Sequence, residues 1–207
     1  MITGFAALLT DYVNNLVYTA GYFGIFLAAL LETVFPPIPS ELVIPTAGYL
    51  AYTLGLGYIG LVGMILSGTL GATVGATIIY FMARKAGRFF VIKYGRYMLI
   101  SESKLAAAEK WFDKYGAKAV FLGRMAPGIR ELVSVPAGLS KMNLKRFLVY
   151  TFAGSLVWTT ILATIGYVLG EAWQGIEISS ITNVLAVLII LSIASYFVFR
   201  VLVKKKR

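Results

Sequence analysis

The chain has 207 residues, of which 59% are hydrophobic and 14% are charged, and its mean hydropathy is +0.82. A soluble domain of this size would lack the polar surface needed to cover itself, and the excess of apolar residues also excludes a disordered chain. The sequence contains no cysteine and no histidine, which excludes disulfides, zinc–thiolate sites and serine–histidine catalysis. The composition predicts an all-α membrane protein that is not an enzyme, with no metal site and no cofactor.

The basic residues are distributed in blocks along the chain. Residues 1–83 contain no lysine or arginine, residues 84–146 contain fourteen of the nineteen, residues 147–199 contain none, and the last five lie within residues 200–207. By the positive-inside rule, the middle block and the C-terminus are expected in the cytoplasm. Uncharged hydrophobic stretches between basic blocks argue against nucleic-acid binding. We therefore expect a multi-pass protein of the cytoplasmic membrane, with anionic lipids as partners of its basic segments.

The first half of the chain divides into three expected segments. Residues 1–19 carry helical spacing with an apolar stripe, which predicts an amphipathic helix; whether it spans the membrane or lies on it stays open. Residues 20–83 form a first repeat that ends in a span over Gly57–Ala83. Residues 84–118 form a basic cytoplasmic segment. Within it, Ser101 is expected to cap a helix that lies on the inner leaflet or serves as a solvated linker.

The second half repeats part of this order. Residues 119–169 form a second repeat that ends in a span over Phe147–Leu169. Residues 170–207 hold a last span over Ile181–Phe199 and a basic tail. Each span is close to the roughly 20 residues that cross a bilayer. The whole is one membrane domain, and its oligomeric state is left open, with a homodimer as one candidate.

Two further apolar stretches, residues 20–54 and 117–140, are interrupted by prolines and charges. Proline breaks a helix and frees backbone carbonyls, which need protein or water partners inside lipid. Because each half of these stretches is too short to span comfortably, both are predicted to be re-entrant helical hairpins. The flanking lysines place the entry of the second hairpin in the cytoplasm. The first has no basic flank and is expected to enter from the outer face.

A short internal repeat supports this arrangement. The segments Pro37–Val43 and Pro127–Val133 share the pattern P-x-x-x-E-L-V at an offset of 90 residues, and Ala-Gly pairs ending at Gly48 and Gly138 follow at the same offset. Two copies that enter from opposite faces form an inverted-topology repeat. Chance similarity between proline-rich membrane turns is the alternative interpretation.

Five charges lie in or beside the broken segments, where each costs about 2.5–3.5 kcal/mol near the bilayer centre. They are Glu32, Glu41, Arg124, Arg130 and Glu131. Arginine binds phosphate oxygens in a fork, so Arg124 and Arg130 are candidates for a phosphate site. Glu32 and Glu41 are candidates for proton coupling or gating, while Glu131, Pro37, Pro127 and Gly138 have supporting roles. The alternative is structural: the charges neutralise each other and pin the hairpins together.

Other residues of the spans indicate packing. Gly63, Gly68, Gly71 and Gly75 provide the small-residue spacing of closely packed membrane helices. Trp158 is interpreted as a packing or interface residue in the same way.

The segment Glu32–Glu41, with the sequence ETVFPPIPSE, resembles the first signature of the DedA family, which is also called the SNARE-associated or VTT-domain family. The segment Phe121–Arg130, followed by Pro136-Ala-Gly138, resembles its second signature, F/Y-x-x-R-x-x-P-x-x-R. The resemblance covers roughly residues 15–205. It implies two facing re-entrant hairpins, with functional acids at Glu32 and Glu41 and arginines at Arg124 and Arg130.

The resemblance also implies transport of a lipid phosphate. Members of that family are implicated in flipping polyprenyl phosphate carriers, notably undecaprenyl phosphate, and others in phospholipid translocation or resistance to cationic drugs. Two arginines on a short motif favour an anionic head group. The expected function is therefore ion-coupled movement of a polyprenyl phosphate. A proton-coupled exporter of small cations, a phospholipid scramblase and a non-transporting scaffold are the alternatives.

Overall fold

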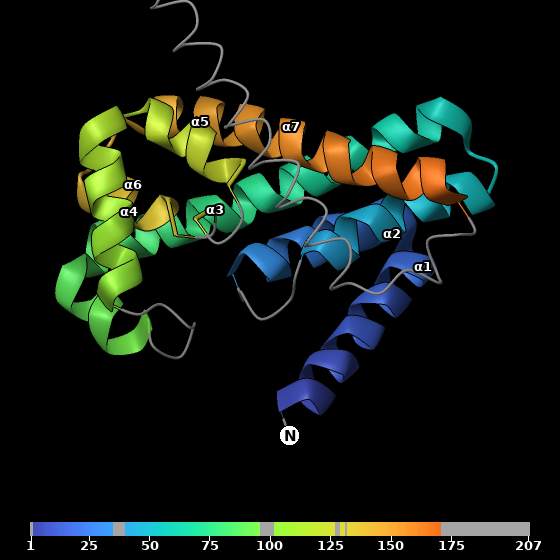
Figure 1. Cartoon of the computed structure of the whole chain (residues 1–207), viewed down its shortest axis with the longest axis horizontal. Helices are drawn as coiled ribbons and strands as arrows, with labels where there is room; N and C mark the ends of the chain where they lie inside the picture. The colour runs from blue at the N-terminus through green and yellow to red at the C-terminus, as the bar shows by residue number, and fades with distance from the viewer. Residues whose placement is uncertain (1, 35–39, 96–101, 127–128, 131, 171–207) are drawn as a thin grey trace, which may run out of the picture. The chain divides into compact units, whose positions relative to one another are not determined.

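The computed structural model describes residues 2–34, 40–95, 102–126, 129–130 and 132–170 (Figure 1). Within these ranges the regular elements are all helices. They are α1 (Ile2–Val34), α2 (Ser40–Thr53), α3 (Gly57–Gly95), α4 (Glu102–Tyr115), α5 (Lys118–Arg124), α6 (Ser134–Leu139) and α7 (Leu144–Leu169). The all-α prediction is confirmed for this part of the chain. The predicted last span, the basic tail and the helix cap at Ser101 lie outside the described residues.

Three helical stretches are long and apolar enough to cross a membrane: Asn15–Val34, Gly57–Gly87 and Leu144–Leu169. The second and third contain the stretches predicted as spans from the sequence, and both are single helices over those stretches. The first differs from the prediction, which divided it between the N-terminal helix and a hairpin arm too short to cross. Helix α1 continues past residue 19 and changes direction at Gly21, whose φ of 52° is readily available to glycine. Asn15–Val34 has the length and composition of a span, but the kink at Gly21 divides it, and residues 22–34 beyond the kink are too few to cross a bilayer by themselves.

Helix α1 packs against α3 along a ridge of glycines. A Cβ atom on Gly71 would overlap the backbone carbonyl of Phe26, and one on Gly75 would lie 2.9 Å from the carbonyl oxygen of Leu30. Gly63 lies against the Tyr22 ring. The prediction that these glycines serve close helix packing is confirmed at these three positions, because a side chain at any of them would displace α1.

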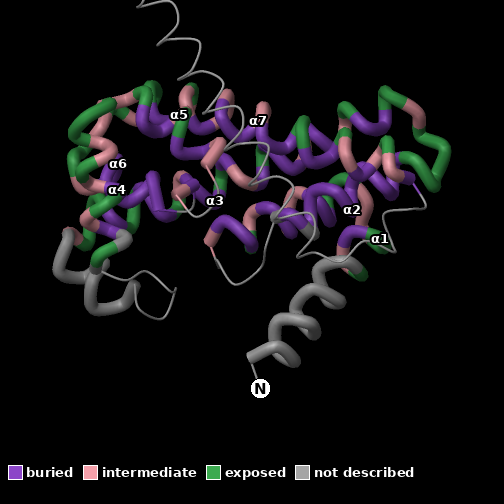
Figure 2. The backbone as a smooth tube through the Cα atoms, viewed as in Figure 1, coloured by how far each residue is buried: buried purple, intermediate pink, exposed green. Residues whose placement is uncertain are grey.

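The shorter helices pack on the two long ones. Helix α5 lies against α7 and α6 lies against α3, while α2 contacts α7 extensively and also touches α1 and α3. Figure 2 shows that buried residues follow one another along α6 and recur in the central turns of α3 and α7. With seven and six residues, α5 and α6 are each too short to cross a bilayer. This confirms that the segment around Pro127 is broken into short pieces.

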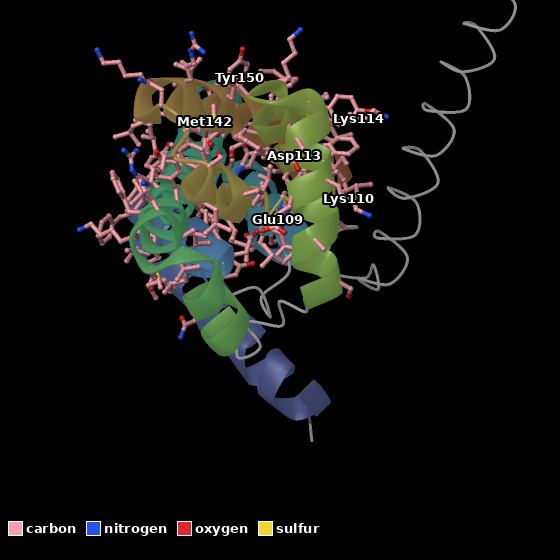
Figure 3. The ribbon with its side chains drawn as sticks, turned by 90° about the vertical axis from the view of Figure 1, so that its left-hand side faces the viewer. Glu109, Lys110, Asp113, Lys114, Met142 and Tyr150 are labelled. Atoms are coloured by element: carbon pink, nitrogen blue, oxygen red, sulfur yellow. The ribbon has the colours of Figure 1, made fainter. Side chains whose placement is uncertain are left out.

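Helix α4 covers part of this assembly. Its Leu105 and Ala108 are buried in a cluster with Ile79 and Ala83 of α3 and Val135 of α6. Protein therefore covers these two side chains, while the position of α4 on the inner leaflet stays a prediction. Figure 3 shows Lys110 and Lys114 extending from the opposite side of α4, where they are exposed.

The two ends of the long helices differ in chemistry. Where α3 begins and α7 ends, the rings of Tyr52 and Tyr58 both contact Tyr167, with centroids 5.9 and 5.5 Å apart. Where α3 approaches Gly87 and α7 begins, the exposed side chains include Arg84, Lys85, Lys145 and Arg146. Tyrosines are enriched at membrane–water interfaces and lysines and arginines on the cytoplasmic side. Each long helix thus has one aromatic end and one basic end.

Candidate functional site

A buried ion pair joins the two halves of the chain. Nη2 of Arg130 lies 2.6 Å from Oε1 of Glu32, and the side chains are 9% and 7% exposed. Glu32 is in the last turn of α1, whereas Arg130 belongs to the turn that precedes α6. An acid of the first broken segment and an arginine of the second therefore meet. A contact this short between charged groups is a strong hydrogen bond.

Arg130 has a second neighbour, the indole ring of Trp158 on α7. The guanidinium carbon lies 5.5 Å from the ring centroid, within the roughly 6 Å range of a cation–π interaction. Trp158 is itself buried. Sequence reasoning assigned Trp158 to packing and missed this contact, because an aromatic residue in an apolar span carries no sign of which charge it faces.

Arg124 ends α5 and is also buried. Its Nη2 donates to Oγ of Ser134, the first residue of α6, at 2.5 Å. A Cβ on Gly154 of α7 would lie 2.8 Å from Cβ of Arg124, so the glycine allows the arginine-bearing helix to approach α7. The guanidinium is thus held between α5, α6 and α7.

The three charges line one small cavity of about 30 Å³. A water molecule needs about 10–15 Å³ of such space, so one or two waters fit. The lining residues come from six parts of the fold, namely α1, α2, α3, α5, the turn before α6, and α7: Ala29, Glu32, Thr33, Ile44, Ala72, Arg124, Arg130, Ser155, Trp158 and Thr159. With two arginines and one glutamate in ionised form, this lining carries a net positive charge, which suits an anion.

The cavity lies near the middle of α3 and of α7. Ala72 is separated from both Tyr58 and Arg84 by roughly 20 Å at 1.5 Å per residue. Ser155 and Trp158 have a similar central position on α7, between its basic and aromatic ends. Ionised side chains at this depth are expensive unless they are paired, and such residues commonly mark transport pathways.

Buried hydroxyl groups share the cavity lining with the charged residues. Thr159 Oγ1 is 2.7 Å from Thr69 Oγ1 on α3 and 2.8 Å from the carbonyl oxygen of Ser155. The buried Thr33 and Ser155 also line the cavity, and the buried Ser134 accepts the hydrogen bond of Arg124. A polar lining without further charge allows water or a head group to be solvated inside an otherwise apolar bundle.

The remaining candidate residues lie elsewhere or outside the described part. Glu41, in the first turn of α2, is 9% exposed but does not line the cavity. No salt bridge links it to another described residue. Gly138 packs against the backbone of α3 at Tyr80 and Arg84. Pro37, Pro127 and Glu131 are outside the described residues, within which no cluster of three acidic, histidine or cysteine side chains occurs.

These features define a class of protein. The described residues form helices, three of which are candidate spans, and a buried ion pair lies midway along α3 and α7; these are features of a polytopic membrane protein. A family model described as the VTT domain matches residues 38–168. The chain belongs to this family, the DedA family, as its two signatures indicated.

Similar proteins extend over nearly the whole chain. One is named undecaprenyl phosphate transporter A from Bacillus subtilis (strain 168), 36% identical over 87% of this chain and 88% of its own length. A Staphylococcus aureus protein of the same name is 28% identical over 97% of this chain and 98% of its own length. A Lactococcus lactis subsp. cremoris protein is named alkaline phosphatase-like protein and is 36% identical over 96% of this chain and 94% of its own length. No solved structure matches the chain.

Proposed function

We propose that this protein moves a polyprenyl phosphate, such as undecaprenyl phosphate, across the cytoplasmic membrane. The observation that carries the proposal is the Glu32–Arg130 pair in a cavity shared with Arg124, midway along the long helices. A lipid phosphate must pass its charge through this depth while its tail remains in hydrocarbon. Two similar proteins named for undecaprenyl phosphate transport support this substrate.

In the proposed mechanism, Glu32 and the substrate phosphate compete for Arg130. When no substrate is bound, the Glu32 carboxylate pairs with the Arg130 guanidinium. The pair neutralises a positive charge whose burial would otherwise cost free energy. An arriving phosphate displaces Glu32 and binds Arg130 and Arg124, because arginine forks match phosphate oxygens. Return of Glu32 to Arg130 then releases the phosphate on the other side.

Coupling to an ion gradient follows from the same exchange. Once displaced, a buried Glu32 carboxylate loses its ion pair with Arg130 and is stabilised by taking up a proton. Glu41 is a second buried acid and would relay protons toward the start of α2. In this scheme, proton movement along the gradient accompanies each passage of the lipid phosphate.

We further propose that residues 20–54 and 117–140 form two re-entrant hairpins of an inverted repeat. The short lengths of α5 and α6, and the contacts of α2 with α7 and of α6 with α3, support this topology. The basic ends of α3 and α7 would face the cytoplasm and their tyrosine-rich ends the outside. The C-terminal tail would also be cytoplasmic.

The test is transport of a labelled polyprenyl phosphate in proteoliposomes, with and without a pH gradient. Arg130→Ala is compared with Arg146→Ala, which removes an exposed arginine. The proposal expects gradient-dependent movement by the wild type and by Arg146→Ala, and none by Arg130→Ala at equal amounts of folded protein. Movement that ignores the gradient would identify a scramblase and overturn the coupling. Movement by Arg130→Ala at the wild-type rate would overturn the phosphate site.

Hydrolysis is a second candidate because one similar protein is named alkaline phosphatase-like. The same vesicles distinguish the two functions, since a phosphatase releases inorganic phosphate and a transporter does not. If the wild type neither moves nor hydrolyses the lipid, competition by quaternary amines in a dye-export assay tests the cation exporter.

A further inference from the structure

We propose that Trp158 is a positioning residue that holds the guanidinium of Arg130 in the cavity while its partner changes from Glu32 to phosphate. This inference rests on the proposed function and concerns the same site. It begins from the geometry: the Arg130 side chain has the Glu32 carboxylate at 2.6 Å and the Trp158 ring at 5.5 Å.

The two neighbours of Arg130 act on it differently. A carboxylate accepts N–H bonds and competes for the same donors that a phosphate would use. The indole ring attracts the positive charge through its face and leaves the N–H donors to other acceptors. Trp158 can therefore stabilise the guanidinium without opposing the arrival of the substrate.

Burial makes this contribution important. Arg130 and Trp158 are 8% and 5% exposed, so little water is available to solvate the guanidinium during the exchange. A cation–π contact is strongest when both groups are desolvated. Without the ring, the guanidinium would lose one of the neighbours that hold it in the cavity at the moment when the carboxylate is displaced.

Placement of the ring also matters. Trp158 lies in the middle of α7, one turn after Gly154, which Arg124 approaches, and one residue before Thr159, which is hydrogen-bonded to α3. The helix that carries the ring is therefore fixed from two sides. A rigid ring defines where the guanidinium sits in both states of the exchange.

The first experiment measures transport by Trp158→Leu and Trp158→Phe against Phe147→Leu. Phe147 is a fully buried ring on the same helix that packs on Tyr80 and lies outside the cavity. Loss of a desolvated cation–π contact predicts that Trp158→Leu raises the half-saturating lipid phosphate concentration by about tenfold or more. Trp158→Phe should restore part of the loss, and Phe147→Leu should leave the half-saturating concentration unchanged. If Trp158→Leu and Phe147→Leu raise the half-saturating concentration equally, Trp158 serves only in packing and the inference is wrong.

The second experiment does not depend on transport, so it separates this inference from the proposed function. With Trp111→Phe and Trp173→Phe, Trp158 is the only tryptophan, and its fluorescence reports on the cation beside it. If the ring holds Arg130, Glu32→Gln should leave the emission maximum near that of the parent, whereas Arg130→Gln should shift it. If Glu32→Gln shifts the emission as much as Arg130→Gln does, the carboxylate alone holds the guanidinium and the inference is wrong. A wild type that moves no lipid phosphate but passes this fluorescence test would refute the proposed function and not the positioning of Arg130.

Discussion

Gly48 and Gly138 make the same kind of contact with opposite halves of the chain. A Cβ atom on Gly48 of α2 would overlap the carbonyl oxygen of Ala163 on α7, and one on Gly138 of α6 would overlap the carbonyl oxygen of Tyr80 on α3. The two glycines are 90 residues apart, the offset of the P-x-x-x-E-L-V repeat. Helices α2 and α6 thus each rest on a long helix of the other half, so neither half is complete alone.

The first prediction concerns these two glycine contacts between the halves of the chain. Gly48→Ala and Gly138→Ala should each destabilise the protein by about 1–3 kcal/mol or more, because an added methyl group meets backbone, which moves only with its helix. Thermal unfolding in detergent should show a lower Tm for both variants. Ala86→Leu, which adds a larger side chain at an exposed position of α3, is the control and should keep the wild-type Tm. If Gly138→Ala keeps the wild-type Tm while Gly48→Ala lowers it, the two contacts are not equivalent.

The second prediction concerns the stability of the buried ion pair. Glu32→Gln alone should cost about 3–5 kcal/mol, because it leaves the Arg130 charge buried without its carboxylate. The double variant Glu32→Gln/Arg130→Gln should be more stable than the sum of the single effects predicts, since it removes both charges. Thermal unfolding of the four proteins forms the double-mutant cycle. Additive costs would mean that the two side chains do not interact in the folded protein.

Transport separates the structural role of this pair from its functional role. If the charges only pin the segments together, the neutral double variant should fold and transport normally. If Arg130 binds phosphate, the double variant should fold and fail to transport. The same preparation of protein serves both measurements, so loss of activity is not confused with loss of fold.

The third prediction concerns the hydrogen bond between Arg124 and Ser134. Ser134→Ala removes the acceptor of Nη2, which is buried and 2.5 Å away. Loss of a buried hydrogen bond to a charged group costs about 1.5–3 kcal/mol, so we expect a lower Tm and slower transport. Ser134→Thr retains the hydroxyl and should recover part of both. Ser140→Ala is the matched control, because Ser140 only bonds the Ala137 carbonyl within its own turn.

The sequence predicted the parts of this fold that follow from local chemistry. The spans ending at Ala83 and Leu169 follow from apolar length, the glycine ridge of α3 from small-residue spacing, and the break around Pro127 from the missing backbone donor. The approach of Glu32 to an arginine followed from the cost of an isolated buried charge. The sequence did not predict which arginine Glu32 meets. Arg124 and Arg130 are only six residues apart, and the turn between them decides the directions of their side chains.

The remaining contacts could not be predicted from the sequence, because they depend on packing between helices that are far apart in the chain. The ring of Trp158 faces Arg130 only because α7 crosses beside the turn before α6, and no spacing within α7 specifies that neighbour. The burial of Leu105 and Ala108 depends in the same way on α4 folding back onto α3 and α6. An amphipathic helix has the same pattern whether lipid or protein covers its apolar face.

The last prediction concerns orientation in the membrane, and the natural absence of cysteine makes it simple to test. Leu54→Cys and Tyr58→Cys place thiols at exposed positions beside the tyrosine-rich ends of the helices, and Lys85→Cys and Lys145→Cys at exposed positions of their basic ends. Because basic residues favour the cytoplasm, an impermeant maleimide applied to intact cells should label the first two variants only. Permeabilised cells should show labelling of all four.

The same reagent tests the tail through Lys205→Cys, for which we expect cytoplasmic protection in intact cells. Labelling of Lys85→Cys without permeabilisation would reverse the orientation. It would then place the phosphate-binding turn at Arg130 on a segment that enters from the outside. Partial labelling of all variants in intact cells would indicate that the chain inserts in both directions. A single orientation is required if a gradient is to drive the lipid phosphate one way, because molecules inserted in opposite directions would couple to the same gradient with opposite effect.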